Sequence, residues 1–136
     1  MVINFIIPGQ PIAKRRPRFA RRGKFVVTYS DQETEEGRFL VSIREQWKNP
    51  PTISPLSLRA TFYVLIPKST SQKKRKLMLE GVLKPNKTPD LDNLIKFFLD
   101  VLNEEVWRDD SQIISLWAEK KFTENPRTEI EITTFP

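Results

Sequence analysis

The order of hydrophobic and polar residues along the chain predicts a small β-sheet with helices packed against it. The clearest strand covers 57–67, where apolar residues at every second position alternate with more polar ones. The stretch VINFII at 2–7, apolar except for Asn4, predicts a buried strand. Further strands are expected at 25–29, at 112–122 and at 128–135.

Three segments carry helical signals. The stretch SDQE, residues 30–33, has the spacing of a capping box, in which Ser30 caps the helix and Glu33 bonds back. The helix that follows has one apolar stripe, made of Phe39, Leu40, Ile43 and Trp47. A short basic helix is expected over SQKKRKLMLE, closed by Gly81. The most apolar helix begins near Thr88.

These elements predict one domain over residues 1–136, because the chain has the length of a single core and shows neither a repeat nor a long linker. The segment 14–24 is basic and is broken by proline and glycine, so a loop or loose hairpin is expected there. The fold class is α/β (α+β): a small mixed sheet packed with two to three helices. A doubly wound sheet is not expected, since there are too few βα units and no glycine-rich phosphate loop.

Composition narrows the chemistry. The chain has no cysteine and no histidine, which excludes thiolate nucleophiles, Cys-based zinc sites and the commonest general base. An enzyme built from this sequence must use carboxylates, lysines, hydroxyls and oxygen-bound cations, for which Mg²⁺ is the natural choice and Mn²⁺ the alternative. The N-terminus does not resemble a signal peptide and no run is long enough to span a bilayer, so we expect a cytoplasmic protein without a membrane partner.

The net charge of +6 is concentrated in two basic blocks, at 14–24 and at 68–87. Such segregation favours a polyanionic partner, most simply nucleic acid. The alternative is a solvated basic face that only keeps the protein soluble. The predicted DNA-binding residues are Lys14, Arg15, Arg16, Arg18, Arg21, Arg22, Lys73, Lys74, Arg75 and Lys76.

The stretch TPDLDNLIK, residues 88–96, places two aspartates at the start of the most apolar helix. One interpretation is an ordinary helix start, in which Thr88 caps, Pro89 is the first helical residue, and Asp90 and Asp92 oppose the helix dipole. Lys96 would then be a surface charge paired with Asp92. The other interpretation is a cation site.

The second interpretation gains support from two further observations. Asp92, Lys96, Asp100 and Asn103 share one narrow polar strip on an otherwise apolar helix. The pair Asp109-Asp110 then precedes a strand, and the two carboxylate clusters can converge if the helix packs on the sheet. Hard divalent cations need several oxygens from different segments with positions left open for water and phosphate.

The stretch TPDLDNLIKFFLDVLNEEVWRDDSQI resembles the signature of the RusA-type Holliday junction resolvases. The shared pattern is D-x-D-N-x-x-K, an apolar helix ending in D-x-L, a short turn, an aromatic residue, a D-D pair, a polar residue and an aliphatic one. Lys120 or Lys121 also suits the strand that follows in that family. The matching positions are Asp90, Asp92, Asn93, Lys96, Asp100, Leu102, Trp107, Asp109, Asp110, Gln112 and Ile113.

The resemblance implies a bacterial or phage endodeoxyribonuclease of DNA recombination and repair, with a RusA-like fold. Asp90, Asp92 and Asp110 would be the catalytic carboxylates that bind Mg²⁺, with Asp109 the adjoining candidate. Lys96 would be a catalytic basic residue near the scissile phosphate. The family works as a homodimer that makes paired, symmetric nicks in four-way junctions, so branched DNA and a second copy of the chain are the expected partners.

Two alternatives stay open at this stage. The first is a non-catalytic basic DNA- or RNA-binding protein in which the D-x-D pair only starts a helix. The second is a nuclease for flaps or other branched DNA. The dimer interface is not determined either, because the aromatic-rich helix around Phe97 and Phe98 and a strand edge are both suitable sources of apolar surface.

Overall fold

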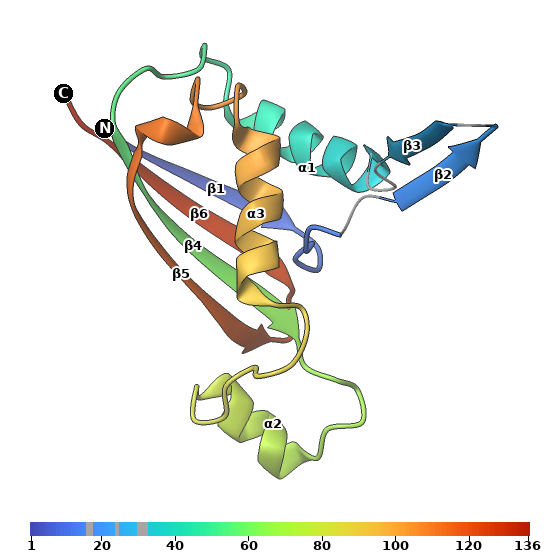
Figure 1. The fold of residues 1–136 in the computed structure, drawn as a ribbon. Helices are drawn as coiled ribbons and strands as arrows, with labels where there is room; N and C mark the ends of the chain where they lie inside the picture. The colour runs from blue at the N-terminus through green and yellow to red at the C-terminus, as the bar shows by residue number, and fades with distance from the viewer. Residues whose placement is uncertain (16–17, 24, 30–32) are drawn as a thin grey trace.

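The computed structural model describes residues 1–15, 18–23, 25–29 and 33–136; between 16 and 32, side-chain surroundings are described only at 21 and 23. Six strands, three α-helices and one short 3₁₀ helix follow one another in these ranges (Figure 1). They are β1 (Val2–Pro8), β2 (Arg18–Arg22), β3 (Phe25–Tyr29), α1 (Glu33–Gln46), β4 (Leu56–Leu65), α2 (Gln72–Leu79), α3 (Leu91–Leu102), η1 (Asp110–Gln112), β5 (Ile113–Thr123) and β6 (Arg127–Thr134).

The centre of the fold is a four-stranded sheet in the order β1-β6-β4-β5. β4 and β5 are parallel, whereas β6 is antiparallel to both β1 and β4, so the sheet is mixed as the sequence predicts. β2 and β3 form a separate antiparallel hairpin, in which β2 comes from the basic segment and β3 is the strand predicted at 25–29. The strands and helices lie within a few residues of their predicted ranges, and the α+β class is confirmed.

β4 lies inside the sheet and alternates strictly between its two faces. Leu58, Ala60 and Phe62 are buried, and the residues between them lie on the opposite face. β1 behaves differently from the prediction of a buried strand, because only Phe5 and Ile7 are buried. The reason is its position: among the described strands β1 pairs with β6 alone, so it is an edge strand and only its helix-facing side is covered.

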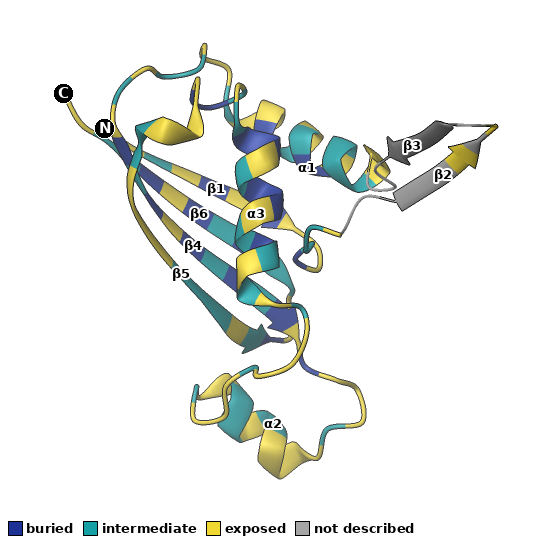
Figure 2. Cartoon of the chain, viewed as in Figure 1, coloured by how far each residue is buried: buried dark blue, intermediate teal, exposed yellow. Residues whose placement is uncertain are grey.

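Helices α1 and α3 pack on one face of the sheet and supply the rest of the core (Figure 1). Phe97 of α3 meets Phe39 of α1 edge-on with ring centroids 5.6 Å apart, and Phe98 lies 5.8 Å from Phe62 of β4. In Figure 2, buried and exposed residues alternate along α3. Each such side chain contributes roughly 1.5–3 kcal/mol by its burial. Phe97 and Phe98 are therefore core residues, and their own side chains are buried within the chain.

The helix ends agree with the sequence signals in part. α2 begins after Ser71, whose hydroxyl accepts a hydrogen bond from the backbone of Lys74 at 3.3 Å, and ends before Gly81 with φ of +80°, as expected. The expected capping box of α1 includes Ser30, which lies outside the described residues. In the part of the chain that the structure describes, none of the helices has the length and apolarity needed to cross a membrane.

Candidate active site

Asp90 and Asp92 lie at the N-terminus of α3 with both side chains exposed. The expected start of this helix is wrong: Asp90 is the N-cap residue, Leu91 is the first helical residue, and Thr88 and Pro89 precede the helix. The carboxylate of Asp90 makes no capping hydrogen bond, and Asp92 accepts one from the backbone of its neighbour Asn93 at 3.0 Å. Two exposed carboxylates thus project where the helix dipole favours negative charge.

Lys120 explains why α3 begins where it does. Its ammonium group reaches from β5 and donates hydrogen bonds to the carbonyl oxygens of Lys87 at 2.8 Å and of Pro89 at 2.9 Å. The segment before Asp90 is thereby held against the sheet instead of continuing the helix backwards. Lys121, the other lysine suggested by the sequence, pairs with Glu119 at 3.1 Å, which raises the pKa of Lys121. Lys120 is therefore a positioning residue for the loop that carries the aspartates.

Lys96 lies one helical turn after Asp92 and is exposed. The surface pair between these two residues is absent: in the described part of the chain, Lys96 makes no ion pair. Asp100, one turn further along, instead pairs with Lys14 at 3.3 Å. The polar strip of α3 thus has two parts. At Asp100 it makes a structural ion pair with Lys14, whereas at its free end, Asp92 and Lys96 are exposed and can bind a charged ligand.

The pair Asp109-Asp110 also divides into two roles. Asp109 caps η1: its carboxylate accepts a hydrogen bond of 2.9 Å from the backbone nitrogen of Ser111. In return, the side-chain oxygen of Gln112 accepts a hydrogen bond of 2.8 Å from the backbone nitrogen of Asp109. The hydrogen bonds from Ser111 hold the pKa of Asp109 below its ordinary value. Asp110 instead accepts a hydrogen bond at 2.7 Å from the indole nitrogen of Trp107, which is fully buried.

The structure does not bring the two acidic clusters together within one chain, so the convergence expected from the sequence is wrong. Asp90 caps the start of α3, a helix of 12 residues that is about 18 Å long, and Asp110 lies beyond the other end of this helix, in η1. Among the described residues, no three acidic side chains lie close enough to hold a metal ion. The donors suit Mg²⁺ chemically, but in a single chain their placement does not.

The predicted DNA-binding residues also differ in their surroundings. Lys14 lies 3.7 Å from Glu36 and 3.3 Å from Asp100, and Arg15 pairs with Glu35, so these two cations are already engaged by acids. In α2, Arg75 pairs with Glu124 at 3.2 Å and Lys76 lies 3.9 Å from Glu80. The side chains of Arg16, Arg18 and Arg22 lie outside the described residues, and those of Arg21, Lys73 and Lys74 are exposed.

Comparison with known proteins agrees with the sequence motif. The family model described as endodeoxyribonuclease RusA matches residues 8–133. An uncharacterized protein of Bacillus subtilis (strain 168), YqaN, is 34% identical over 134 residues, covering 96% of this chain and 94% of that protein. The crossover junction endodeoxyribonuclease rusA of Lactococcus phage r1t is 41% identical over 80 residues, covering 58% of this chain and 54% of that protein.

Proposed function

This chain belongs to the endodeoxyribonuclease RusA family, and on that basis we propose that it is a Mg²⁺-dependent endonuclease that cuts four-way DNA junctions in recombination and repair. The observation that carries the proposal is the free end of α3. Among the described residues, neither Asp90 and Asp92 nor Lys96, one turn after Asp92, makes an ion pair, and the chain has no histidine or cysteine. Oxygen ligands can hold a metal ion that assists phosphodiester hydrolysis, and a nearby cation can stabilise the charge that develops on the phosphate.

We assign Mg²⁺ binding to Asp90, Asp92 and Asp110, and Mn²⁺ is the alternative ion. The ion would supply Lewis-acid stabilisation of charge on the phosphate. Lys96 follows Asp92 by one turn on the same face of α3 and would stabilise negative charge on the same phosphate. Asp109 is left out of the ligand set, because its carboxylate already accepts hydrogen bonds from Ser111 as a cap.

The separation of the carboxylates supports a site formed by two chains. β5 lies beside α3 and starts at Ile113, directly after η1, which begins with Asp110; near the other end of β5, Lys120 touches the loop before Asp90. If two copies of β5 met edge to edge and antiparallel across a two-fold axis, the start of one strand would lie beside the end of the other. Asp110 of one copy would then approach Asp90 and Asp92 of the second, and the dimer would hold two such sites.

The edge of β5 is better suited to this pairing than the edge of β1. Along β5, the exposed apolar residues Ile114, Leu116 and Trp117 are 65%, 41% and 43% accessible. The edge of β1 is blocked, because the side chain of Gln46 accepts from the backbone nitrogen of Ile6 at 3.0 Å and donates to its carbonyl at 2.9 Å. An open edge with apolar side chains is the usual route by which a sheet extends into a second copy.

A labelled four-way junction, incubated with Mg²⁺ or with EDTA, tests the proposal. We expect paired nicks on opposed strands in Mg²⁺ and none in EDTA, and light scattering should give twice the chain mass of 16.0 kDa. Tight binding without cutting in either Mg²⁺ or Mn²⁺ would contradict the proposal in favour of a DNA-binding protein. Faster cutting of a flap than of the junction would support a nuclease whose preferred substrate is a flap.

A further inference from the structure

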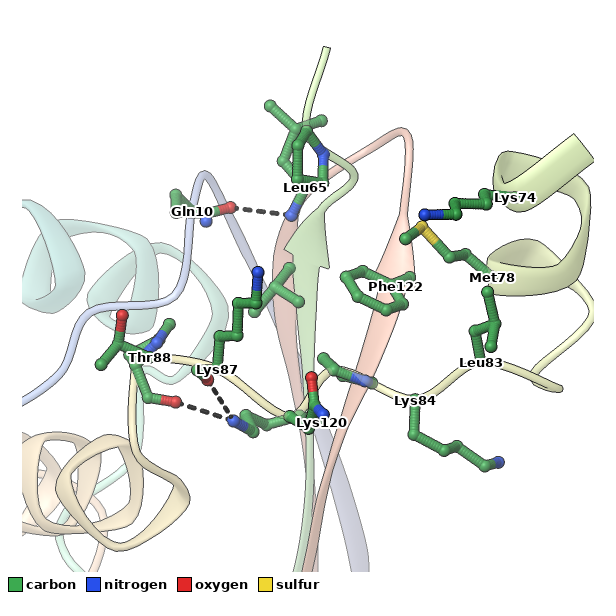
Figure 3. Close-up of a pocket in the computed structure, with 15 residues that line it drawn as sticks. Gln10, Leu65, Lys74, Met78, Leu83, Lys84, Lys87, Thr88, Lys120 and Phe122 are labelled. Carbon is green, nitrogen blue, oxygen red and sulfur yellow. Dashed lines mark hydrogen bonds between the residues drawn. The ribbon is translucent and has the colours of Figure 1, made fainter. Parts of the chain in front are cut away.

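A cavity of about 530 Å³ lies between α2, the end of β5 and the loop that leads to Asp90. Figure 3 shows that the ring of Phe122 faces this cavity from β5, with Met78 beside it on α2. Leu83 and three prolines complete its apolar walls. The volume falls within the range of sites that hold small molecules or single building blocks of a polymer, roughly 300–1,000 Å³.

The charged groups around the cavity are all cationic. No acidic residue is among the described side chains that line it. Lys74 enters from α2 and Lys87 from the opposite loop, and both ammonium groups extend toward the cavity in Figure 3. Lys84 points away, toward Gly81, where its ammonium would lie 3.7 Å from an added Cβ. The cavity therefore offers an aromatic and apolar interior with one lysine at each side.

Its position relates it to the candidate active site. Lys87, Thr88 and Pro89 line the cavity, and Asp90 is the next residue along the chain. The two hydrogen bonds from Lys120 to the carbonyls of Lys87 and Pro89 hold this shared segment in place. A ligand in the cavity would therefore be anchored directly beside the aspartates.

We propose that this cavity binds one unpaired nucleotide of the DNA substrate, with the base against Phe122 and Met78 and the flanking phosphates on Lys74 and Lys87. The proposal rests on the proposed function and deepens it, since it places a strand-end or branch-point nucleotide next to the cut. Aromatic stacking recognises the face of a base, whereas lysines bind phosphate. Unpaired nucleotides are the natural occupants, because moving a base out of a duplex costs stacking and pairing energy that a branch point has already lost.

The test compares two labelled oligonucleotides of equal length and charge in EDTA, one of thymidines and one of abasic sites. We expect the wild type to bind the thymidine strand about tenfold more tightly, because one stacked base contributes at about that scale. Phe122→Leu should bring this ratio close to one. Phe135→Leu, the same change at an exposed aromatic residue outside the cavity, should leave the ratio unchanged. A wild-type ratio near one, or an unchanged ratio in Phe122→Leu, would overturn the proposal.

The lysines are tested with matched double variants. Lys74→Ala/Lys87→Ala should weaken thymidine-strand binding about fivefold more than Lys48→Ala/Lys68→Ala, since each pair removes the same charge and only the first lines the cavity. Equal losses would contradict the role of Lys74 and Lys87. If Phe122→Leu does not fold, Leu83→Glu at the exposed rim should lower the base preference, and an unchanged preference there would be decisive against the cavity.

Because these measurements need no cutting, they separate the two proposals. If the wild type cuts junctions but shows no base preference, the nuclease proposal is supported and the nucleotide-binding cavity is contradicted. If the protein shows a base preference that depends on Phe122 but cuts no DNA with Mg²⁺, the nucleotide-binding cavity is supported and the nuclease proposal is contradicted. Competition by free thymidine monophosphate as strong as that by the oligonucleotide would indicate a site for free nucleotides and would overturn the proposal.

Discussion

The indole nitrogen of Trp107 donates a hydrogen bond of 2.7 Å to Oδ1 of Asp110. Trp107 is fully buried, and its backbone forms bridges with Thr52 and Asn103, so the donor has a fixed place. Asp110 itself is exposed. A rigid core residue therefore orients a surface carboxylate, as the residues behind metal ligands commonly do.

Trp107→Phe should remove this hydrogen bond while keeping most of the aromatic packing. We expect single-turnover cutting of a four-way junction to fall by about 10–100-fold, the usual cost of losing a partner behind a metal ligand. Junction binding in EDTA should not change. Slower cutting with unchanged binding would show that the substitution affects the orientation of Asp110 and not the surface that binds DNA. Cutting at the wild-type rate by a folded Trp107→Phe would show that the orientation of Asp110 is unimportant.

Asp92→Asn should abolish cutting and retain or strengthen junction binding, because it removes a negative charge that faces phosphate. Asp109→Asn is the matched control: asparagine also caps helices, so this variant should fold and cut near the wild-type rate. The measurement is cutting with Mg²⁺ beside binding in EDTA. An active Asp92→Asn would exclude that residue as a ligand, and an inactive but folded Asp109→Asn would add Asp109 to the ligand set.

Asp109→Ala should lower the melting temperature at neutral pH, because the cap of η1 is lost. The hydrogen bonds from Ser111 lower the pKa of Asp109 in the folded state. Its contribution is therefore complete above the ordinary aspartate pKa and is lost as pH falls through the lowered value. The difference in melting temperature between wild type and Asp109→Ala should shrink below about pH 4. A constant difference down to pH 2 would rule out the charged cap.

The salt dependence of junction binding should distinguish basic residues that pair with acids from basic residues that are exposed. Lys73→Ala and Arg21→Ala remove exposed cations, and each should reduce the slope of log K against log salt concentration by about 0.9 if it contacts phosphate. Lys14→Ala should change the slope less, since its ammonium lies between Glu36 and Asp100. A larger slope change in Lys14→Ala than in Lys73→Ala would reverse this ranking.

Much of the fold could be predicted from local pattern, since period-two and helical spacing describe which face of an element is buried. What the pattern could not give was the neighbour of each element. The stretch 2–7 has the composition of a central strand, yet β1 is an edge because, in the described part of the chain, it pairs only with β6, at the far end of the sequence. The signals for a helix start at Thr88 and Pro89 are locally good, but Lys120 bonds that segment from 31 residues further on.

The candidate site shows the same division. The motif identified Asp90, Asp92 and Lys96 by residue type and spacing, and the structure leaves these side chains exposed. The motif could not distinguish the roles of Asp109 and Asp110, because these roles depend on the hydrogen bonds from Ser111 to Asp109 and from Trp107 to Asp110. The motif places a helix between the two carboxylate clusters, but it could not show that they stay apart among the described residues of one chain. Distances between elements are set by packing and not by order in the sequence.

The most direct measurement of the two-chain nuclease site mixes two inactive variants, Asp92→Asn and Asp110→Asn, after co-refolding. If each site takes Asp90 and Asp92 from one chain and Asp110 from the other, a mixed dimer contains one site with all of its wild-type carboxylates. We predict that the mixture nicks one strand of a four-way junction with Mg²⁺, whereas either variant alone is inactive. A mixture that exchanges chains and stays inactive, while the wild type cuts, would contradict the shared site.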